Sequence, residues 1–304
     1  TAPDGRGVYD CGGAPEALAV GSFDGGKSTL FALSASKDWT TSVGRFDLFA
    51  SYTHADVKDI GYGTSSTATS NYSDFAAYDR QSPREGTSNF QVEHMFKLRL
   101  NWRKELIDGY ETKASLFATR RSGQPYSYTF SENNNCVLDL NGGRCARESR
   151  NDDAGHLLYV PDGINDPLFS AASFGGVVAD QQAFIDYING SELARYAGGI
   201  APRNGDNSSM TTMVDLRIQQ ELPALNPEHS FKLFFDIENL GNLLNDDWGK
   251  ITDAVFFTPQ VVNSSVDSAG RLVFEDFNNR SLERTIINRS LWEARVGFDI
   301  NFGK

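Results

Sequence analysis

The sequence contains no apolar run of about 18 residues, the length that a membrane-spanning helix needs. A helical membrane protein is therefore excluded. Its first residues also lack the basic segment and apolar stretch of a secretory leader, so we expect the chain to continue a longer protein. Basic residues are few, with 28 Lys and Arg against 40 Asp and Glu and a net charge of −12. Phosphate backbones repel such a chain, so nucleic acid is excluded as a partner.

Cysteine is scarce, with three copies in the chain. Cys136 and Cys145 border a polar segment rich in Asn and Gly, and their spacing suits a small disulfide loop in an oxidising compartment. Cys11 would then need a partner outside this chain. The alternative is three free thiols.

Catalytic and metal-binding motifs are also missing. The four histidines have no metal-ligand spacing, and neither C-x-x-C nor H-E-x-x-H occurs. Residues 21–28 match the phosphate-binding pattern G-x-x-x-x-G-K-[ST], but the residues that follow alternate like a strand and predict no helix. The acidic segments 151–153 and 245–247 could hold Ca²⁺, although solvated loop charge is the simpler interpretation. We expect no enzymatic activity, no cofactor and no other metal.

The dominant pattern is an alternation of apolar and polar residues, which is typical of strands with two different faces. It is clearest in Leu291–Phe302, where every second residue from Trp292 onward is apolar. The pattern predicts seven strands, at 28–39, 46–52, 96–103, 110–130, 214–219, 231–237 and 291–302. Several are as long as the roughly 9–11 residues of a membrane-crossing strand. We therefore predict an all-β fold, a transmembrane antiparallel β-barrel.

The connections alternate between short and long. Short turns are expected near 40–43, 106–109 and 223–229, and long connections cover about 61–89, 131–210 and 248–290. Outer-membrane barrels have short periplasmic turns and long extracellular loops. The sequence thus predicts a bacterial outer-membrane location with a periplasmic C-terminus and long loops outside.

Seven strands cannot close such a barrel, because bacterial barrels have an even number of strands and leave no edge unpaired in lipid. We expect residues 1–304 to be the C-terminal part of a larger barrel. Its partners would be outer-membrane lipid and the N-terminal remainder of the same barrel, as a separate chain or as a part not included here. The last strand would pair with the absent first strand.

Two of the long loops contain local patterns. In 131–210, residues 180–198 place Phe184, Tyr187 and Ile188 at helical spacing, which indicates a short helix or irregular coil. In 248–290, residues 255–274 could form a hairpin around the sequence DSAGR.

Candidate site residues follow from the two faces of the strands. The basic residues on the polar faces are expected to line a lumen, where they would pair with acidic wall residues or with a plug; they are Lys97, Arg99, Arg103, Arg217 and Arg295. The aromatic residues Tyr126, Tyr128 and Trp248 would lie near the outer rim. They could bind ligand there or belong to the girdle at the membrane interface.

Five segments resemble TonB-dependent outer-membrane receptors of the Oar-like group. They are RRSGQPYSYTF (120–130), DPLF (166–169), IAPRN (200–204), DLRIQQELP (215–223) and FKLFFDIENLGNLLNDDWG (231–249). The ending FDINF is similar to the aromatic C-terminal signature of outer-membrane barrels, although Gly303 and Lys304 follow it here. The resemblance implies a 22-stranded barrel, an N-terminal plug domain and coupling to TonB.

We therefore expect the C-terminal barrel portion of a transporter that takes up a large nutrient, peptide or protein cargo, without covalent chemistry. Two alternatives remain open. A passive porin or adhesin barrel would be complete in one chain, and a secreted soluble β-protein that binds glycans would stay monomeric without detergent.

Overall fold

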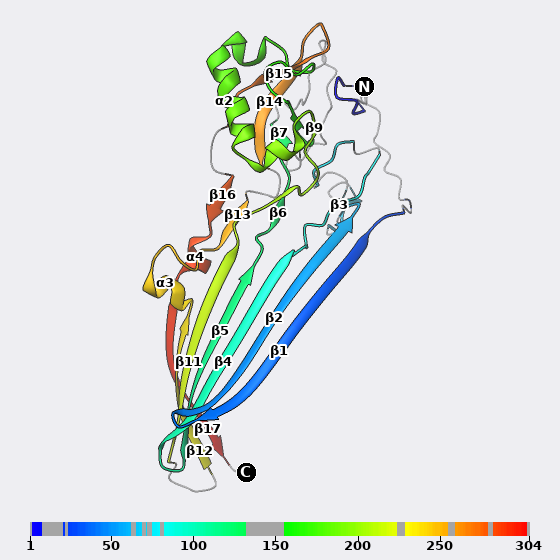
Figure 1. Ribbon diagram of the computed structural model, residues 1–304. Coiled ribbons are helices and arrows are strands. Elements are labelled where there is room, and N and C mark those ends of the chain that lie inside the picture. Colours follow the sequence, from blue (N-terminus) through cyan, green and yellow to red (C-terminus); the bar gives the residue numbers. More distant parts are fainter. Residues whose placement is uncertain are drawn as a thin grey trace.

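The computed structural model describes residues 2–7, 21, 24–61, 65–68, 71, 75–79, 82–131, 155–223, 229–254, 259–278 and 282–302. The molecule is elongated, with a long curved sheet at one end and a small mixed module at the other (Figure 1). We call this module the cap, and define it as residues 2–7, 125–131, 155–207 and 259–278. Among the described residues, no helix is both long and apolar enough to cross a membrane.

The long sheet contains seven main strands, each beside its neighbours in sequence and antiparallel to them. They are β1 (Lys27–Thr41), β2 (Gly44–Asp59), β4 (His94–Ile107), β5 (Tyr110–Arg121), β11 (Thr211–Leu222), β12 (His229–Glu238) and β17 (Glu293–Phe302). The short β3 (Gly86–Thr87) pairs with the end of β2. The prediction of an all-β fold built from antiparallel strands is confirmed.

The register of the sheet separates apolar and polar side chains. Residues opposite one another on antiparallel strands point to the same face. Leu98 lies opposite Ala50 and Ala118, and Phe235 lies opposite Ile218 and Val296. The apolar face therefore continues across all the strands; it includes Leu33, Phe46, Leu48, Phe96, Leu98, Leu100, Leu116, Val214, Leu216, Ile218, Leu233, Phe235, Val296, Phe298 and Ile300.

The strand ends that the short connections join lie at the end of the sheet far from the cap (Figure 1). The turn from β1 to β2 uses Ser42 and Val43, and the Trp102 indole of β4 donates a hydrogen bond of 2.9 Å to the Val43 carbonyl. Gly44 follows with φ of 141°, and a Cβ there would overlap the same indole. The sorting of short and long connections agrees with the sequence prediction.

One predicted strand is wrong in its length. The segment 110–130 does not continue as a single strand, because β5 ends at Arg121 and the chain leaves the sheet. Gly123 lies against the backbone of Ser208, where no side chain would fit. Pro125 lacks the N–H that a ladder requires. Two short strands follow, β6 (Pro125–Tyr126) and β7 (Thr129–Phe130).

The long connections are folded segments. In the cap, β14 (Gln260–Val266) lies between β7 and β15 (Leu272–Glu275), β8 (Tyr159–Val160) pairs with β9 (Gly199–Ile200), and β10 (Asp206–Asn207) pairs with β6. The cap helices are η1 (Ser173–Gly176), α2 (Val178–Asn189) and η2 (Glu192–Tyr196). Between sheet and cap lie α3 (Leu240–Leu244), α4 (Ile287–Ser290) and the pair β13 (Thr252–Ala254) and β16 (Glu283–Thr285). The short helix and the hairpin expected from the sequence correspond to α2 and to β14–β15.

The hydrophobic core of the described residues lies in the cap. Phe130, Phe184 and Phe274 are fully buried, although they come from three distant parts of the chain. The Phe274 ring lies 5.3 Å from that of Phe184 and 6.3 Å from that of Phe130. Leu158, Val160, Ile188 and Leu272 pack in the same cluster. The apolar residues of the long sheet have no comparable core.

Candidate functional site

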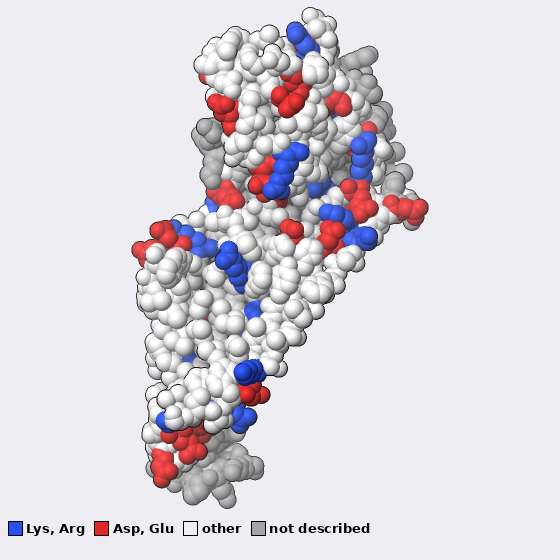
Figure 2. Space-filling view, viewed as in Figure 1, with Lys and Arg blue, Asp and Glu red and all other residues white. Residues whose placement is uncertain are grey.

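The apolar face of the long sheet is exposed in the described chain. The exposed fraction is 72% for Val296, 66% for Phe298 and 62% for Leu33. Contiguous apolar surface of this extent is rare on a soluble monomer and marks contact with a membrane or another protein. Figure 2 shows few charged side chains on the visible middle part of the sheet, and more near the turns and on the cap.

Charged residues on the apolar face lie mainly toward the ends of the strands. Lys58 and Arg120 are near the cap, and Lys104 is near the turns. Lys37 lies further along β1, opposite Leu48, and its long apolar stem can carry the ammonium group toward the turn end. Apart from Lys37, the described side chains between these two ends of the apolar face are uncharged.

The opposite face carries ion pairs between neighbouring strands. Asp47 accepts a hydrogen bond of 2.7 Å from the Asn101 amide and pairs with Arg103 at 3.4 Å and Arg99 at 3.7 Å. The Arg99 guanidinium also lies over the Phe49 ring, 5.8 Å from its centroid. One carboxylate of β2 is thus held by three side chains of β4.

A second group of ion pairs joins β11, β12 and β17 on the same polar face. Arg217 pairs with Asp236 at 3.4 Å and lies over the Phe234 ring, 4.4 Å from its centroid. Arg295 pairs with Glu238 and, at 3.5 Å, with Glu293. Lys97 lies on this face too, between Ser51 and Thr119 of its neighbouring strands. All five basic residues singled out in the sequence share one face.

Comparisons with protein-family models, curated proteins and solved structures return no match for this chain. The assignment of function therefore rests on the geometry of the two faces and of the cap.

Tyr126 and Tyr128 lie inside the cap, with exposed fractions of 5% and 2%. Their hydroxyl groups donate hydrogen bonds of 2.7 and 2.6 Å to the same carboxylate oxygen of Asp206. Burial raises the pKa of both phenols, and for Tyr128 the hydrogen bond to Asp206 raises it further. This placement does not agree with the prediction of binding residues at an exposed rim. Because the chain leaves the sheet after Arg121, the alternation that places side chains on β5 no longer applies to them.

Trp248 is 57% exposed and follows α3 at the cap end of the sheet, as expected for a rim residue. The segment just before Trp248, residues 245–247, is one of the two candidate Ca²⁺ sites of the sequence analysis. Lys250 hydrogen-bonds the Asp247 carboxylate at 2.7 Å and lowers its pKa, while Asn245 Oδ1 accepts from the Asp247 N–H. Within the described part of the chain, no cluster of three or more metal-ligand side chains includes this segment.

Several sequence predictions fall on residues that the structure does not describe. They are the disulfide of Cys136 and Cys145, the unpaired Cys11 and the acidic segment 151–153. The phosphate-loop pattern can be followed at its end, where Lys27 and Ser28 belong to β1. A strand in place of a helix after the glycines is not the context of a phosphate loop.

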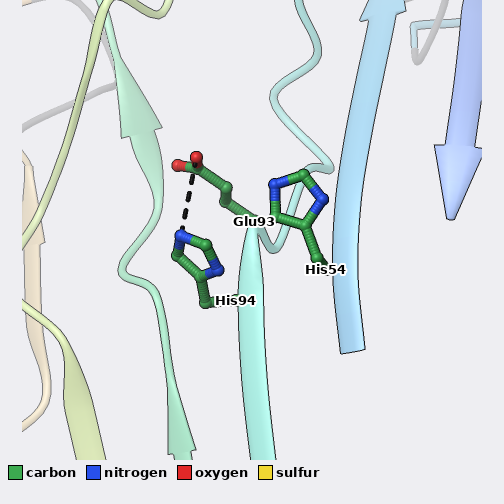
Figure 3. Close-up of side chains that lie close together, drawn as sticks. All are labelled: His54, Glu93 and His94. Atoms are coloured by element: carbon green, nitrogen blue, oxygen red, sulfur yellow. Dashed lines mark ion pairs between the residues drawn. The ribbon is translucent and has the colours of Figure 1, made fainter. Parts of the chain in front are cut away.

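The structure brings together one cluster that spacing in the sequence did not predict. His54 on β2 and His94 on β4 are register partners, with ring centroids 5.1 Å apart, and Glu93 lies beside both (Figure 3). His94 Nε2 is 3.6 Å from Glu93 Oε1, and Tyr52 Oη hydrogen-bonds His94 Nδ1 at 2.9 Å. Only the register between two strands could have revealed this cluster.

Proposed function

We propose that the long sheet is a segment of a transmembrane β-barrel in a bacterial outer membrane. The observation that carries the proposal is the division of the sheet into a continuous exposed apolar face and a face of cross-strand ion pairs. The seven strands have 10 to 16 residues, and a tilted strand needs about 9–11 to cross the hydrocarbon layer. The apolar face would contact lipid and the polar face a lumen.

The edges of the sheet support a larger barrel. Among the described residues, β1 pairs with β2 alone and β17 pairs with β12 alone. Unpaired backbone groups are costly in lipid, because no water is present to satisfy them. Further strands of the same barrel would therefore join these two edges, and in a receptor of the Oar-like group they would belong to a 22-stranded barrel that encloses a plug.

We further propose that the barrel serves energised transport of a large nutrient, peptide or protein cargo through coupling to TonB. The paired arginines would form a polar lumen wall against which a plug can rest. The cap lies at the end of the sheet away from the short turns, which would be the extracellular end. Cargo would meet the cap first.

The membrane proposal is tested by placing single fluorescent labels on adjacent residues of β17. In a background with all three native cysteines replaced by serine, Val296→Cys and Arg295→Cys are labelled in the protein reconstituted in lipid vesicles. Quenchers attached to lipid tails should quench the label at 296 strongly and the label at 295 weakly. Equal quenching at both positions would refute a lipid-facing apolar face.

The transport proposal needs a separate test. The protein isolated from its native membrane should carry, in the same chain or in a companion chain, a plug domain with a TonB-binding segment. Cargo uptake should then stop when TonB is deleted. Uptake that persists without TonB would favour a passive porin. A protein that remains monomeric in the absence of detergent would favour the soluble glycan-binding alternative.

A further inference from the structure

We propose that His54, Glu93 and His94 form a binding site for a divalent transition-metal ion. One potential ligand atom from each residue lies within 4.8 Å of the other two. Figure 3 shows the Glu93 carboxylate and both imidazole rings close together. His94 is the first residue of β4, at the end of this strand nearer the cap (Figure 1). This inference does not depend on transport, because it concerns only the geometry of three side chains.

The donor set favours particular ions. Two imidazole nitrogens and one carboxylate oxygen suit Zn²⁺, Cu²⁺ or Ni²⁺, whereas Ca²⁺ and Mg²⁺ prefer sites built from oxygen. Zn²⁺ is bound at roughly 2.0–2.2 Å, so the three side chains would have to rotate toward a common point when an ion binds. The side chains of His94 and Glu93 are 39% and 38% exposed, so an ion can enter from solvent.

The backbone that carries the ligands is fixed on both sides. The Glu93 carbonyl accepts a hydrogen bond of 2.9 Å from the Ala55 N–H of β2. The His94 N–H donates to Ser122 Oγ at 3.0 Å, and the His94 carbonyl accepts from the Ser122 N–H at 2.8 Å. Only side-chain rotation therefore remains to be restricted when an ion binds, which lowers the entropic cost of binding.

Two neighbours orient the ligands. Tyr52 Oη lies 2.9 Å from His94 Nδ1, and its ring packs against Phe96 at 4.7 Å between centroids. If Nδ1 donates to this oxygen, Nε2 is left with its lone pair free for a metal. The Asn207 amide lies 3.5 Å from the Glu93 oxygen Oε2, and the other oxygen, Oε1, is the one directed at His94.

Three protein ligands leave a tetrahedral ion with an open position. His54 and His94 share the apolar face with Phe96 and Leu98 but lie at its cap end. The open position would therefore lie at the outer membrane interface beside the cap, where a water molecule or a donor group of an incoming molecule could complete the shell. The ion would also join β2 to the start of β4. We assign the site metal binding only, with no reaction attached to it.

Calorimetric titration of Zn²⁺ into the detergent-solubilised protein, prepared without a polyhistidine tag, tests the proposal. We expect one equivalent to bind, and affinity to fall at least tenfold in His54→Ala, Glu93→Gln and His94→Ala. His229→Ala, which removes a histidine at the opposite end of the sheet, should bind like the unchanged protein. Equal binding by all four variants, or no saturable binding by the unchanged protein, would overturn the proposal.

Two further measurements extend the test, and the first does not depend on the folding of any variant. In the unchanged protein, bound Cu²⁺ should show hyperfine coupling to two imidazole nitrogens in its electron paramagnetic resonance spectrum. Coupling to none would overturn the site. Tyr52→Phe retains all three ligands, and loss of the partner of His94 should weaken Zn²⁺ binding by about 10–100-fold. Unchanged affinity in this variant would contradict the orienting role of Tyr52.

Discussion

The aromatic ring of Phe234 lies directly against the backbone of Gly297, its register partner on the neighbouring strand. A Cβ on Gly297 would overlap the ring. The same ring supports the guanidinium of Arg217 on its other neighbour, β11. Because Gly297 has no side chain, the ring of Phe234 fits against β17 and holds Arg217 in position on the polar face.

Gly297→Val should destabilise the sheet by about 1–3 kcal/mol, since an added side chain forces Phe234 out of its position. We expect a lower thermal midpoint and a weaker Arg217–Asp236 pair. The double variant Gly297→Val, Phe234→Ala makes room for the added methyl groups and should recover part of the stability. If the double variant is no more stable than the single one, steric overlap with Phe234 is not the cause.

Phe298→Lys should prevent stable insertion of the sheet into lipid. A lysine on the lipid-facing side near the middle of a bilayer costs about 2–4 kcal/mol. Asn301→Lys on the same strand faces the other way and should have little effect. Heat-modifiable electrophoretic mobility after refolding into vesicles measures both variants. Equal losses in the two would contradict the assignment of the faces.

Arg203→Ala should loosen the contact between the cap and the long sheet. Arg203 is 5% exposed and pairs with Asp59, the last residue of β2, at 2.6 Å. Breaking a buried pair costs about 3 kcal/mol or more, because the remaining charge loses its partner. Arg195→Ala, which removes an exposed pair with Glu192, should cost less than about 1 kcal/mol. Amide hydrogen exchange in β8 and β9 should be faster in Arg203→Ala than in Arg195→Ala.

Tyr126 and Tyr128 should resist ionisation until the cap unfolds. Burial raises the pKa of each phenol above its ordinary value of 10.0. Their stabilising contribution is complete below pH 10 and is lost as the pH rises through the higher pKa of the folded state. A tyrosinate absorbance titration should therefore show a late step coincident with unfolding. That step should shrink in the variant Tyr126→Phe, Tyr128→Phe, whereas an unchanged late step would refute the assignment.

The turn between β14 and β15 should lose stability in strong acid. A hydrogen bond from Ser170 at 2.7 Å, with further ones from the Arg271 and Ala269 N–H groups, lowers the pKa of Asp267 from 3.8 to about 2. The stabilisation is present above 3.8 and disappears as the pH falls through about 2. Asp267→Asn should abolish this part of the acid transition, and Ser170→Ala should reduce it. Hydrogen exchange of the Leu272 amide measures both.

The long sheet was predictable because its signal is local. Alternation along β17 alone shows which residues share a face, and the turn lengths fix antiparallel order. The end of β5 was not predictable, since the alternation fades gradually while the break depends on contact between Gly123 and the distant Ser208. The cap core was also missed, because Phe130, Phe184 and Phe274 meet only in three dimensions.

The candidate sites likewise have features that follow from the local sequence and features that depend on contacts between distant residues. The shared face of Arg99 and Arg103 follows from their spacing within one strand, whereas their pairing with Asp47 depends on the register with β2. The approach of His54 to His94 requires that register to be correct to a single residue. Tyr128 was expected at the outer rim because it stands near the end of the predicted strand 110–130. Its burial depends on contacts made after the chain leaves the sheet, among them the hydrogen bond to the Asp206 carboxylate.

Two long connections, from β5 to β11 and from β12 to β17, supply most of the cap. Each is closed near its base by a short pair of strands, β6–β10 in the first and β13–β16 in the second. Closing a long loop is slow and entropically unfavourable, although the free-energy cost grows only with the logarithm of its length. A cap that folds first would hold the ends of β5 and β11 together through β6 and β10, much as a tight turn does for β4 and β5. The order of assembly would then run from the insertions to the strands, and a defect confined to the cap would appear as slow formation of the sheet.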